Sequence, residues 1–184
     1  MNVYFDTEFT GLHKDTTLIS IGLVAENGKT FYAEFSDYDT SQVDDWIQEN
    51  VIDNLQFNHM STHMSARQGC VEMKGPKKYV GECLRIWFDQ FKEPFGGVQL
   101  VSDVCHYDMV LLIDLFGSAF DLPKCVNAAC HDINQDIARH FNITEAEAFD
   151  YCREDLIREE IPGKKHNSLY DARVIQAIYK IVNR

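Results

Sequence analysis

The chain has 184 residues, of which 45% are hydrophobic and 12% aromatic, and its formal net charge at pH 7 is −12. These values predict one globular domain, residues 1–184, with a substantial core, and they exclude an intrinsically disordered chain. The negative charge argues against a protein that coats long nucleic acids through a broad basic face. It does not exclude a nuclease, because catalytic acids bring divalent cations of their own.

The sequence has no apolar run of 18 residues and no basic segment that leads into an apolar stretch near residue 1. We therefore expect neither a membrane span nor a signal peptide. The six cysteines are scattered and form no Cys-x-x-Cys pair, which favours reduced thiols. These observations predict a cytoplasmic protein or one in an equally reducing compartment.

The hydrophobic pattern predicts an α/β order of elements. Strands are expected at 2–6, 18–25, 30–35, 98–102 and 125–130, with an Asn27-Gly28 hairpin turn between the second and third. Helices are predicted at 41–55, 78–92, 107–116, 133–140, 144–155 and 168–183. Trp46 shares helical spacing with apolar neighbours, so we expect it in the core. Residues 56–76 are polar and contain two glycines and a proline, which predicts an inserted loop.

The first strand leads into two acids, Asp6 and Glu8. Side chains alternate across a strand, so both carboxylates are expected on the same side if the extended conformation continues. Two carboxylates at the carboxyl end of a strand form an oxygen site suited to Mg²⁺ or Mn²⁺. An Asp-x-Glu pair alone is more often a solvated turn, so a metal site requires partners elsewhere in the chain.

Two later segments supply such partners. Asp108 lies at the start of an apolar helix after the fourth strand, and Asp103, at the end of that strand, is the competing candidate. Further along, His166 lies five residues before Asp171, which is in the first turn of the last helix. A capping box with Ser168 as the N-cap would explain Asp171. It would not explain His166, so the joint pattern favours a catalytic site.

Five residues together resemble the site of the DEDDh branch of the DnaQ-like 3′→5′ exonucleases: Asp6, Glu8, Asp108, His166 and Asp171. The resemblance covers residues 3 to about 180 and is most specific in Phe5-Asp6-Thr7-Glu8 and in the last motif. The asparagine common four residues before the middle acid is absent, because Val104 stands there. Within the superfamily, the chain is most similar to a small, single-domain bacterial and phage exoribonuclease group.

This resemblance implies a ribonuclease H-like α/β fold: a mixed five-stranded sheet with a leading antiparallel meander and flanking helices. It implies metal-dependent 3′→5′ removal of nucleotides from single-stranded RNA. Two Mg²⁺ or Mn²⁺ ions would be held by the four acids, with His166 as the general base. The resemblance also implies contacts of Phe9, Thr10 and Leu12 with the 3′-terminal nucleotide, and we expect Lys165 near a phosphate.

Two alternative functions stay open. One is a 3′→5′ exonuclease that acts on single-stranded DNA by the same chemistry. The other is a catalytically weak module that binds nucleic-acid ends, although such a module has no need for His166. The sequence is compatible with a homo-oligomer. It disfavours a zinc site at His59, His63 and Cys70, because a fourth ligand with suitable spacing is missing.

Overall fold

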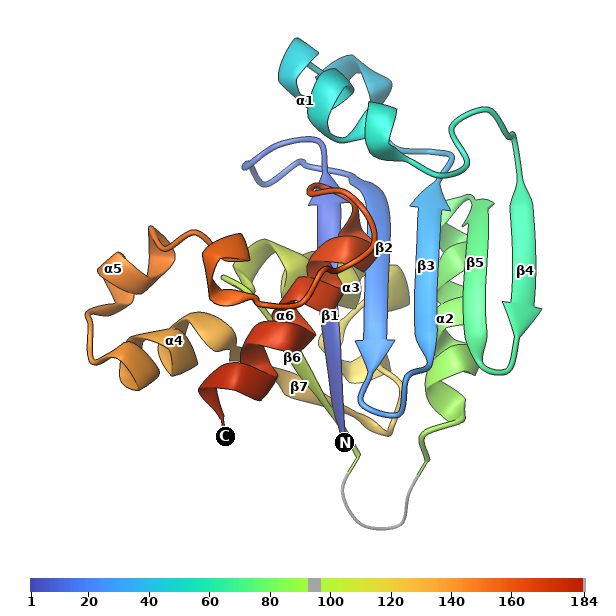
Figure 1. Cartoon of the computed structure of the whole chain (residues 1–184). Helices are drawn as coiled ribbons and strands as arrows, with labels where there is room; N and C mark the ends of the chain where they lie inside the picture. The colour runs from blue at the N-terminus through green and yellow to red at the C-terminus, as the bar shows by residue number, and fades with distance from the viewer. Residues whose placement is uncertain (93–96, 184) are drawn as a thin grey trace.

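A computed structural model describes residues 1–92 and 97–183 of the chain (Figure 1). The strands in this part are β1 (Asn2–Phe9), β2 (Leu18–Ala25), β3 (Thr30–Phe35), β4 (His63–Arg67), β5 (Cys70–Gly75), β6 (Val98–Ser102) and β7 (Val126–Asp132). The helices are α1 (Asp45–Asn50), α2 (Lys77–Asp89), α3 (His106–Phe116), α4 (Ile133–Phe141), α5 (Glu145–Phe149) and α6 (Ser168–Val182). None of the helices in the described ranges is long and apolar enough to cross a membrane.

The strands form one mixed sheet in the order β4-β5-β3-β2-β1-β6-β7. β1, β2 and β3 are an antiparallel meander, and β6 and β7 continue the sheet in parallel to β1. The prediction of an α/β sheet that begins with a meander is confirmed. The sheet has seven strands in the described part of the chain rather than five, and β4 and β5 are the additional pair.

The two additional strands come from residues 56–76, where we expected a loop. β4 and β5 form an antiparallel hairpin, and β5 pairs in parallel with β3. Its turn has positive φ angles at Gln68 (51°) and Gly69 (83°), as a tight hairpin turn requires. The expectation of a loop is wrong for residues 63–75, because the unpaired edge of β3 supplies a backbone partner for a polar segment.

Two predicted helices are shorter than expected, each for a local reason. Asp44 caps α1 by accepting a hydrogen bond from the Ile47 N–H, so the helix begins well inside the predicted range 41–55. α5 ends at Phe149, within the predicted range 144–155. There the Arg153 guanidinium donates to the carbonyl oxygens of Ala148 and Tyr151, which competes with continuation of the helix.

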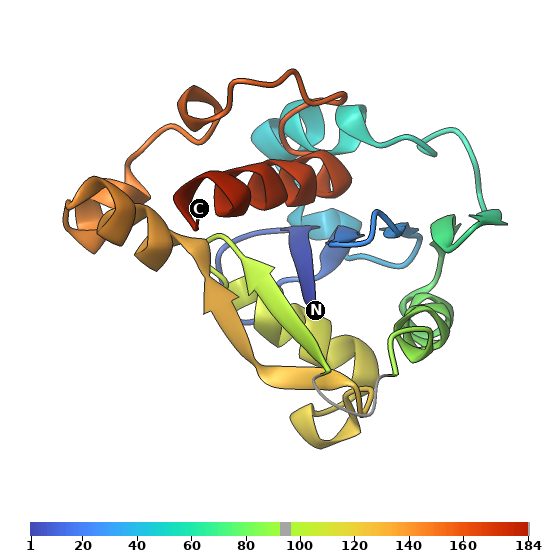
Figure 2. The same cartoon turned by 60° about the horizontal axis from the view of Figure 1, so that its bottom comes forward.

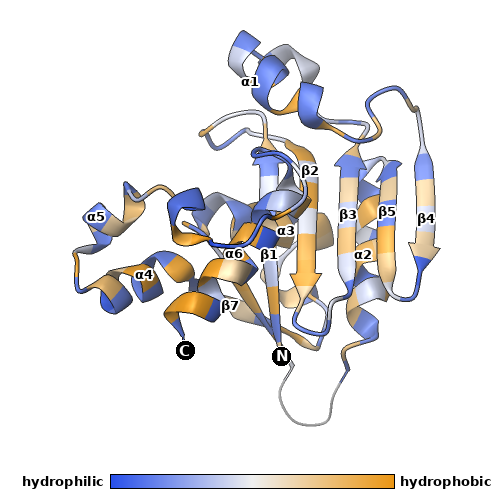
Figure 3. Cartoon of the chain, in the orientation of Figure 1, coloured by the Kyte–Doolittle hydropathy of each residue, from blue (hydrophilic) through white to orange (hydrophobic). Residues whose placement is uncertain are grey.

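Helix α6 covers one face of β1 and β2, while α2 and α3 cover the opposite face (Figure 2). Between these layers β2 is buried along its whole length and is strongly hydrophobic (Figure 3). On β1, Phe5 packs into the core cluster on the side of α2 and α3, whereas Tyr4 packs into the cluster on the side of α4 and α6. By alternation, Asp6 and Glu8 lie on the α6 side, and Thr7 lies on the α3 side.

The sheet and α6 approach each other most closely at Gly22 of β2. A Cβ atom on Gly22 would lie 2.3 Å from the backbone carbonyl carbon of Ser168 and from the backbone nitrogen of Leu169. We expect Gly22→Ala to lower the free energy of unfolding by about 3 kcal/mol or more, because the helix backbone must move. Urea denaturation measures the loss.

Gly28→Ala is the matched control, since Gly28 has φ +85° but open space around it. This variant should lose only about 1–2 kcal/mol, from the left-handed backbone conformation. Equal losses for the two variants would contradict the argument from close packing at Gly22.

Candidate active site

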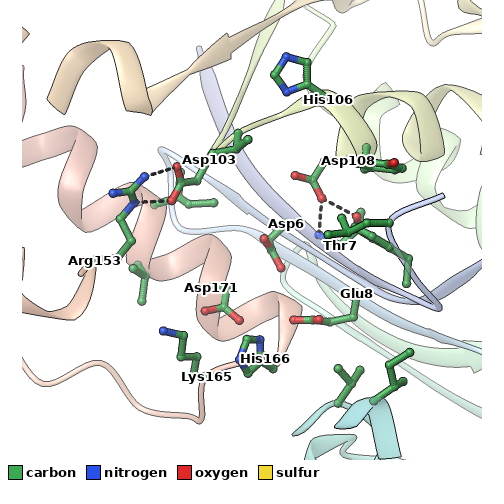
Figure 4. Close-up of a pocket in the computed structure, with 18 of the residues that line it drawn as sticks. Asp6, Thr7, Glu8, Asp103, His106, Asp108, Arg153, Lys165, His166 and Asp171 are labelled. Atoms are coloured by element: carbon green, nitrogen blue, oxygen red, sulfur yellow. Dashed lines mark hydrogen bonds and ion pairs between the residues drawn. The ribbon is translucent and has the colours of Figure 1, made fainter. Parts of the chain in front are cut away.

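Three acids meet at the carboxyl end of β1 (Figure 4). Asp6 and Glu8 come from β1, as the alternation predicted, and Asp171 comes from the first turn of α6; one ligand atom of each lies within 4.8 Å of the others. Oδ2 of Asp171 is buried and has no hydrogen-bond partner among the described residues. This is the one group of three metal-ligating side chains found in residues 1–92 and 97–183. A buried carboxylate oxygen without a partner fits a cation ligand.

The buried acids of this cluster are unfavourable in their charged forms. Burial raises the pKa of Asp6 and of Glu8 well above the ordinary value, and the charges of neighbouring acids, Asp108 and Asp171 among them, raise both further. Burial also raises the pKa of Asp171 to about 7. Folding therefore favours a proton or a cation at this cluster over a set of bare charges.

We expect Asp171→Asn to stabilise the metal-free protein at neutral and higher pH. A carboxyl whose pKa is raised by folding adds stability below its unfolded pKa near 4. That contribution is lost as the pH rises through the folded value of about 7. The gain in the free energy of unfolding should thus be near zero at pH 4 and on the order of 4 kcal/mol at pH 8.

Thermal unfolding of both proteins in EDTA across this pH range measures the gain. The exposed Asp150→Asn is the control, because it removes a carboxylate outside the pocket and should give no such pH-dependent gain. A constant difference between Asp171→Asn and the parent protein from pH 4 to 8 would contradict the argument.

Asp108, in the first turn of α3, lines the same pocket from the other side of β1. Its Oδ1 accepts hydrogen bonds from the Thr7 N–H (3.1 Å) and the Thr7 hydroxyl, and its Oδ2 accepts one from the Ser102 hydroxyl (2.9 Å). Burial raises the pKa of Asp108 to about 6, against the lowering effect of these bonds. Oδ1 already accepts two hydrogen bonds, whereas Oδ2 accepts one and keeps a second lone pair, so Asp108 can still serve as a ligand through Oδ2.

The competing acid, Asp103, is committed to an ion pair with Arg153, whose Nη2 lies 2.8 Å from Asp103 Oδ1. Arg153 also donates to the other Asp103 oxygen, to two backbone carbonyls and to Asn134 Oδ1. These bonds use the five N–H groups of a guanidinium. The arrangement favours Asp108 as the middle acid. Arg153 was not predicted, because its partner Asp103 lies 50 residues away in the sequence.

His166 lies on the loop that enters α6, beside the acids and edge-on to Trp46, with 5.1 Å between the ring centroids. Burial lowers the pKa of His166, and the charge of Lys165 lowers it further, so the imidazole is neutral at pH 7. Trp46 is 54% exposed and lines the pocket, so its expected place in the core is wrong. Trp46, on α1, is exposed and contacts the His166 ring instead of the core.

The start of α6 differs from the predicted capping box. Asn167 is the N-cap and accepts a hydrogen bond from the Tyr170 N–H. The Ser168 hydroxyl is instead hydrogen-bonded to the Ser20 hydroxyl on β2, at 2.9 Å. The capping prediction is therefore wrong by one residue, because the close approach of β2 gives Ser168 a buried partner that the sequence does not show.

The acids and His166 line a cavity of about 740 Å³. Phe9, Leu12 and Lys165 also line it. Phe9 stacks on Tyr107, with 5.4 Å between the ring centroids, and Leu12 is 78% exposed. The Lys165 ammonium lies 3.2 Å from a Glu154 carboxylate oxygen. These side chains give the cavity an apolar wall and one cationic side.

Thr10 lies behind the cavity wall, where it is buried. Its N–H donates to the Thr17 carbonyl oxygen (3.0 Å), and its hydroxyl accepts from the Thr17 N–H (2.9 Å) and donates to Gln42. The backbone and side chain of Thr10 are thus engaged in fixing the loop after β1. The disfavoured zinc ligand His63 stacks on Phe57, with 4.1 Å between the ring centroids.

The structure has a ribonuclease H-like α/β fold, and the acidic cluster at the carboxyl end of β1 suits a divalent cation. The chain is similar in structure to a solved protein described as "3'-end specific recognition of histone mRNA stem-loop by 3'-exonuclease", with a TM-score of 0.69 and 11% identity. The match covers 99% of this chain and 62% of that one. At this identity the likeness shows the fold alone.

Residues 1–182 match the model of the 3'-5' exoribonuclease Rv2179c-like domain, so the chain belongs to this family. Two proteins of Mycobacterium tuberculosis are similar in sequence: the 3'-5' exoribonuclease Rv2179c of strain ATCC 25618 / H37Rv and the 3'-5' exoribonuclease MT2234.1 of strain CDC 1551 / Oshkosh. Each is 28% identical over 135 residues, which is 73% of this chain and 73% of the relative. The suspected family is confirmed.

Proposed function

We propose that the chain removes nucleotides from the 3′ end of single-stranded RNA with two Mg²⁺ or Mn²⁺ ions held by Asp6, Glu8, Asp108 and Asp171. The observation that carries the proposal is the cluster of Asp6, Glu8 and Asp171, with its unpartnered buried oxygen. Hard carboxylate oxygens are the ligands that these cations prefer. When bound, such ions activate the attacking water and stabilise the charge that develops on the leaving 3′ oxygen.

His166 accepts the proton of the attacking water in this proposal. Its lowered pKa keeps the imidazole neutral, and therefore basic, at pH 7. Its ring lies beside Glu8 and Asp171 (Figure 4), where a water held by the acids would be within reach. A histidine at this position has no use in a module that only binds nucleic-acid ends, so the geometry favours the enzyme over that alternative.

The cavity wall holds the 3′-terminal nucleotide. The backbone at Phe9 and the exposed side chain of Leu12 contact the sugar and base, and Lys165 approaches a phosphate by turning from Glu154. Thr10 contributes by fixing the loop between Phe9 and Leu12 through its bonds to Thr17. The positions of Phe9, Leu12 and Lys165 in the cavity lining support this division of roles.

The family description and the names of the relatives favour RNA over DNA as the substrate. The described strands form one continuous sheet, which supports a single exonuclease domain over residues 1–184. The six free thiols support a reducing, cytoplasmic location. The alternative substrate, single-stranded DNA, remains an outcome of the activity assay.

The assay uses single-stranded RNA and DNA of the same sequence, labelled at the 5′ end, with Mg²⁺, Mn²⁺ or EDTA. We expect a ladder that shortens from the 3′ end, requires a divalent cation and forms faster on RNA. A faster ladder on DNA would replace the substrate in the proposal. Intact oligomers under every metal condition would overturn the proposal in favour of a binding module.

A further inference from the structure

A network of polar side chains, most of them buried, connects the β4–β5 hairpin to the loop of His166. Lys74, on β5, has its ammonium 3.7 Å from Glu34 Oε2. Glu34 Oε1 accepts hydrogen bonds from the Tyr32 hydroxyl and from the Phe57 N–H, each at 2.9 Å. The Tyr32 hydroxyl in turn accepts one from Asn167 Nδ2, at 3.2 Å. The network thus ends at Asn167, the residue next to the proposed general base.

These groups are buried at a cost that apolar side chains would avoid. Glu34 and Tyr32 are 0% exposed, and Asn167 is 7% exposed. A buried carboxylate is costly unless it is paired and hydrogen-bonded. Here Lys74 pairs with Glu34, whose Oε1 accepts two hydrogen bonds and whose Oε2 accepts none among the described residues. Burial raises the pKa of Tyr32, as does the charge of Glu34, so its hydroxyl stays neutral and can donate to Glu34 while accepting from Asn167.

The loop at the end of this network needs such support, because His166 has a strained backbone. Its φ is +60°, in the left-handed region that costs a residue other than glycine about 1–2 kcal/mol. The flanking peptide groups are held in place: Asn54 Nδ2 donates to the Lys165 carbonyl (3.3 Å), and the Asn167 N–H donates to the Lys164 carbonyl (3.2 Å). Asn167 Nδ2 also contacts the Asn54 carbonyl oxygen, at 3.4 Å.

We propose that Tyr32, Glu34 and Lys74 are positioning residues for His166, and that the β4–β5 hairpin serves the active site by supplying Lys74. Lys74 balances the charge of Glu34, and Glu34 fixes the direction of the Tyr32 hydroxyl. That hydroxyl orients the Asn167 amide, which holds the strained loop with the imidazole beside the acids. The inference rests on the proposed function of His166 as the general base.

The test is Tyr32→Phe, which removes the hydroxyl and keeps the ring that fills the core. We expect kcat on labelled RNA to fall about ten- to a hundredfold, as expected for a misplaced catalytic group. KM and the affinity for Mn²⁺, measured by calorimetry, should not change. Tyr4→Phe is the matched control, because Tyr4 is 1% exposed and packs against α4 and α6, away from the polar network. Its kcat should equal that of the parent protein.

Asn54→Ala gives a second route to the same loop, since it removes the bond to the Lys165 carbonyl and leaves Tyr32 in place. It should also lower kcat with KM and Mn²⁺ affinity unchanged. Parent-like kcat in both Tyr32→Phe and Asn54→Ala would overturn the inference.

A double-mutant cycle distinguishes positioning of His166 from a general structural role. In the His166→Ala background, Tyr32→Phe should cause no further loss of rate, because the group that it positions is absent. The same ten- to a hundredfold loss in that background would overturn the inference and leave the proposed function standing. Parent-like turnover by His166→Ala alone would instead overturn the assigned role of His166, and the inference with it.

Discussion

The Asp6→Ala variant is expected to hydrolyse RNA about a thousandfold more slowly, or worse, and to bind divalent cations more weakly. Asp6 lies in the acid cluster with Glu8 and Asp171. Burial raises its pKa, and the charges of Asp108, Asp171 and Glu8 raise it further. Metal ions supply several kcal/mol of transition-state stabilisation, and about 1.4 kcal/mol corresponds to a factor of ten in rate. Loss of the Asp6 carboxylate would weaken cation binding and, with it, this contribution. Single-turnover cleavage of 5′-labelled RNA and calorimetric titration with Mn²⁺ measure the two losses.

The variant should fold, because removing Asp6 relieves repulsion within the cluster. Its thermal unfolding temperature in EDTA should equal or exceed that of the parent protein, which distinguishes a lost ligand from a damaged fold. Asp150→Asn serves here too as the control for charge alone. It should lose neither turnover nor cation binding. Undiminished turnover by Asp6→Ala would contradict the proposed metal site.

Local sequence patterns predicted the parts of the molecule that depend on near neighbours. Alternation along β1 placed Asp6 and Glu8 on one side, and both contribute to the acid cluster. The Asn27-Gly28 turn predicted the β2–β3 hairpin, which the structure contains. In each case the residues that determine the geometry lie within a few positions of one another.

The predictions that failed depended on partners distant in the sequence. β5 exists because it pairs with β3, and no local pattern in residues 56–76 shows that partner. Ser168 is bonded to Ser20 across 148 positions, which moves the helix cap to Asn167. Trp46 has core-like spacing on α1 but contacts His166 instead. The choice between Asp103 and Asp108 likewise needed the distant Arg153.

His166→Ala is expected to lower turnover by a factor of about 10² to 10⁴, the usual contribution of a general base, while cation binding stays unchanged. The imidazole is not part of the acid cluster, so its removal leaves the proposed ligands in place. The same single-turnover assay and Mn²⁺ titration, applied to this variant, separate the two properties. Asp6→Ala, in contrast, should lose both.

The pH dependence gives an independent test of the role of His166. Because burial and the charge of Lys165 lower the pKa of His166, the neutral base persists to a lower pH than for a free histidine. The turnover of the parent protein should hold down to below about pH 6.5 before protonation of the imidazole reduces it. His166→Ala should lack this part of the profile and should regain turnover when free imidazole is added as a substitute base. If His166→Ala keeps near-parental rates, the proton of the attacking water goes to a group other than His166, even if all four acids bind metal as proposed.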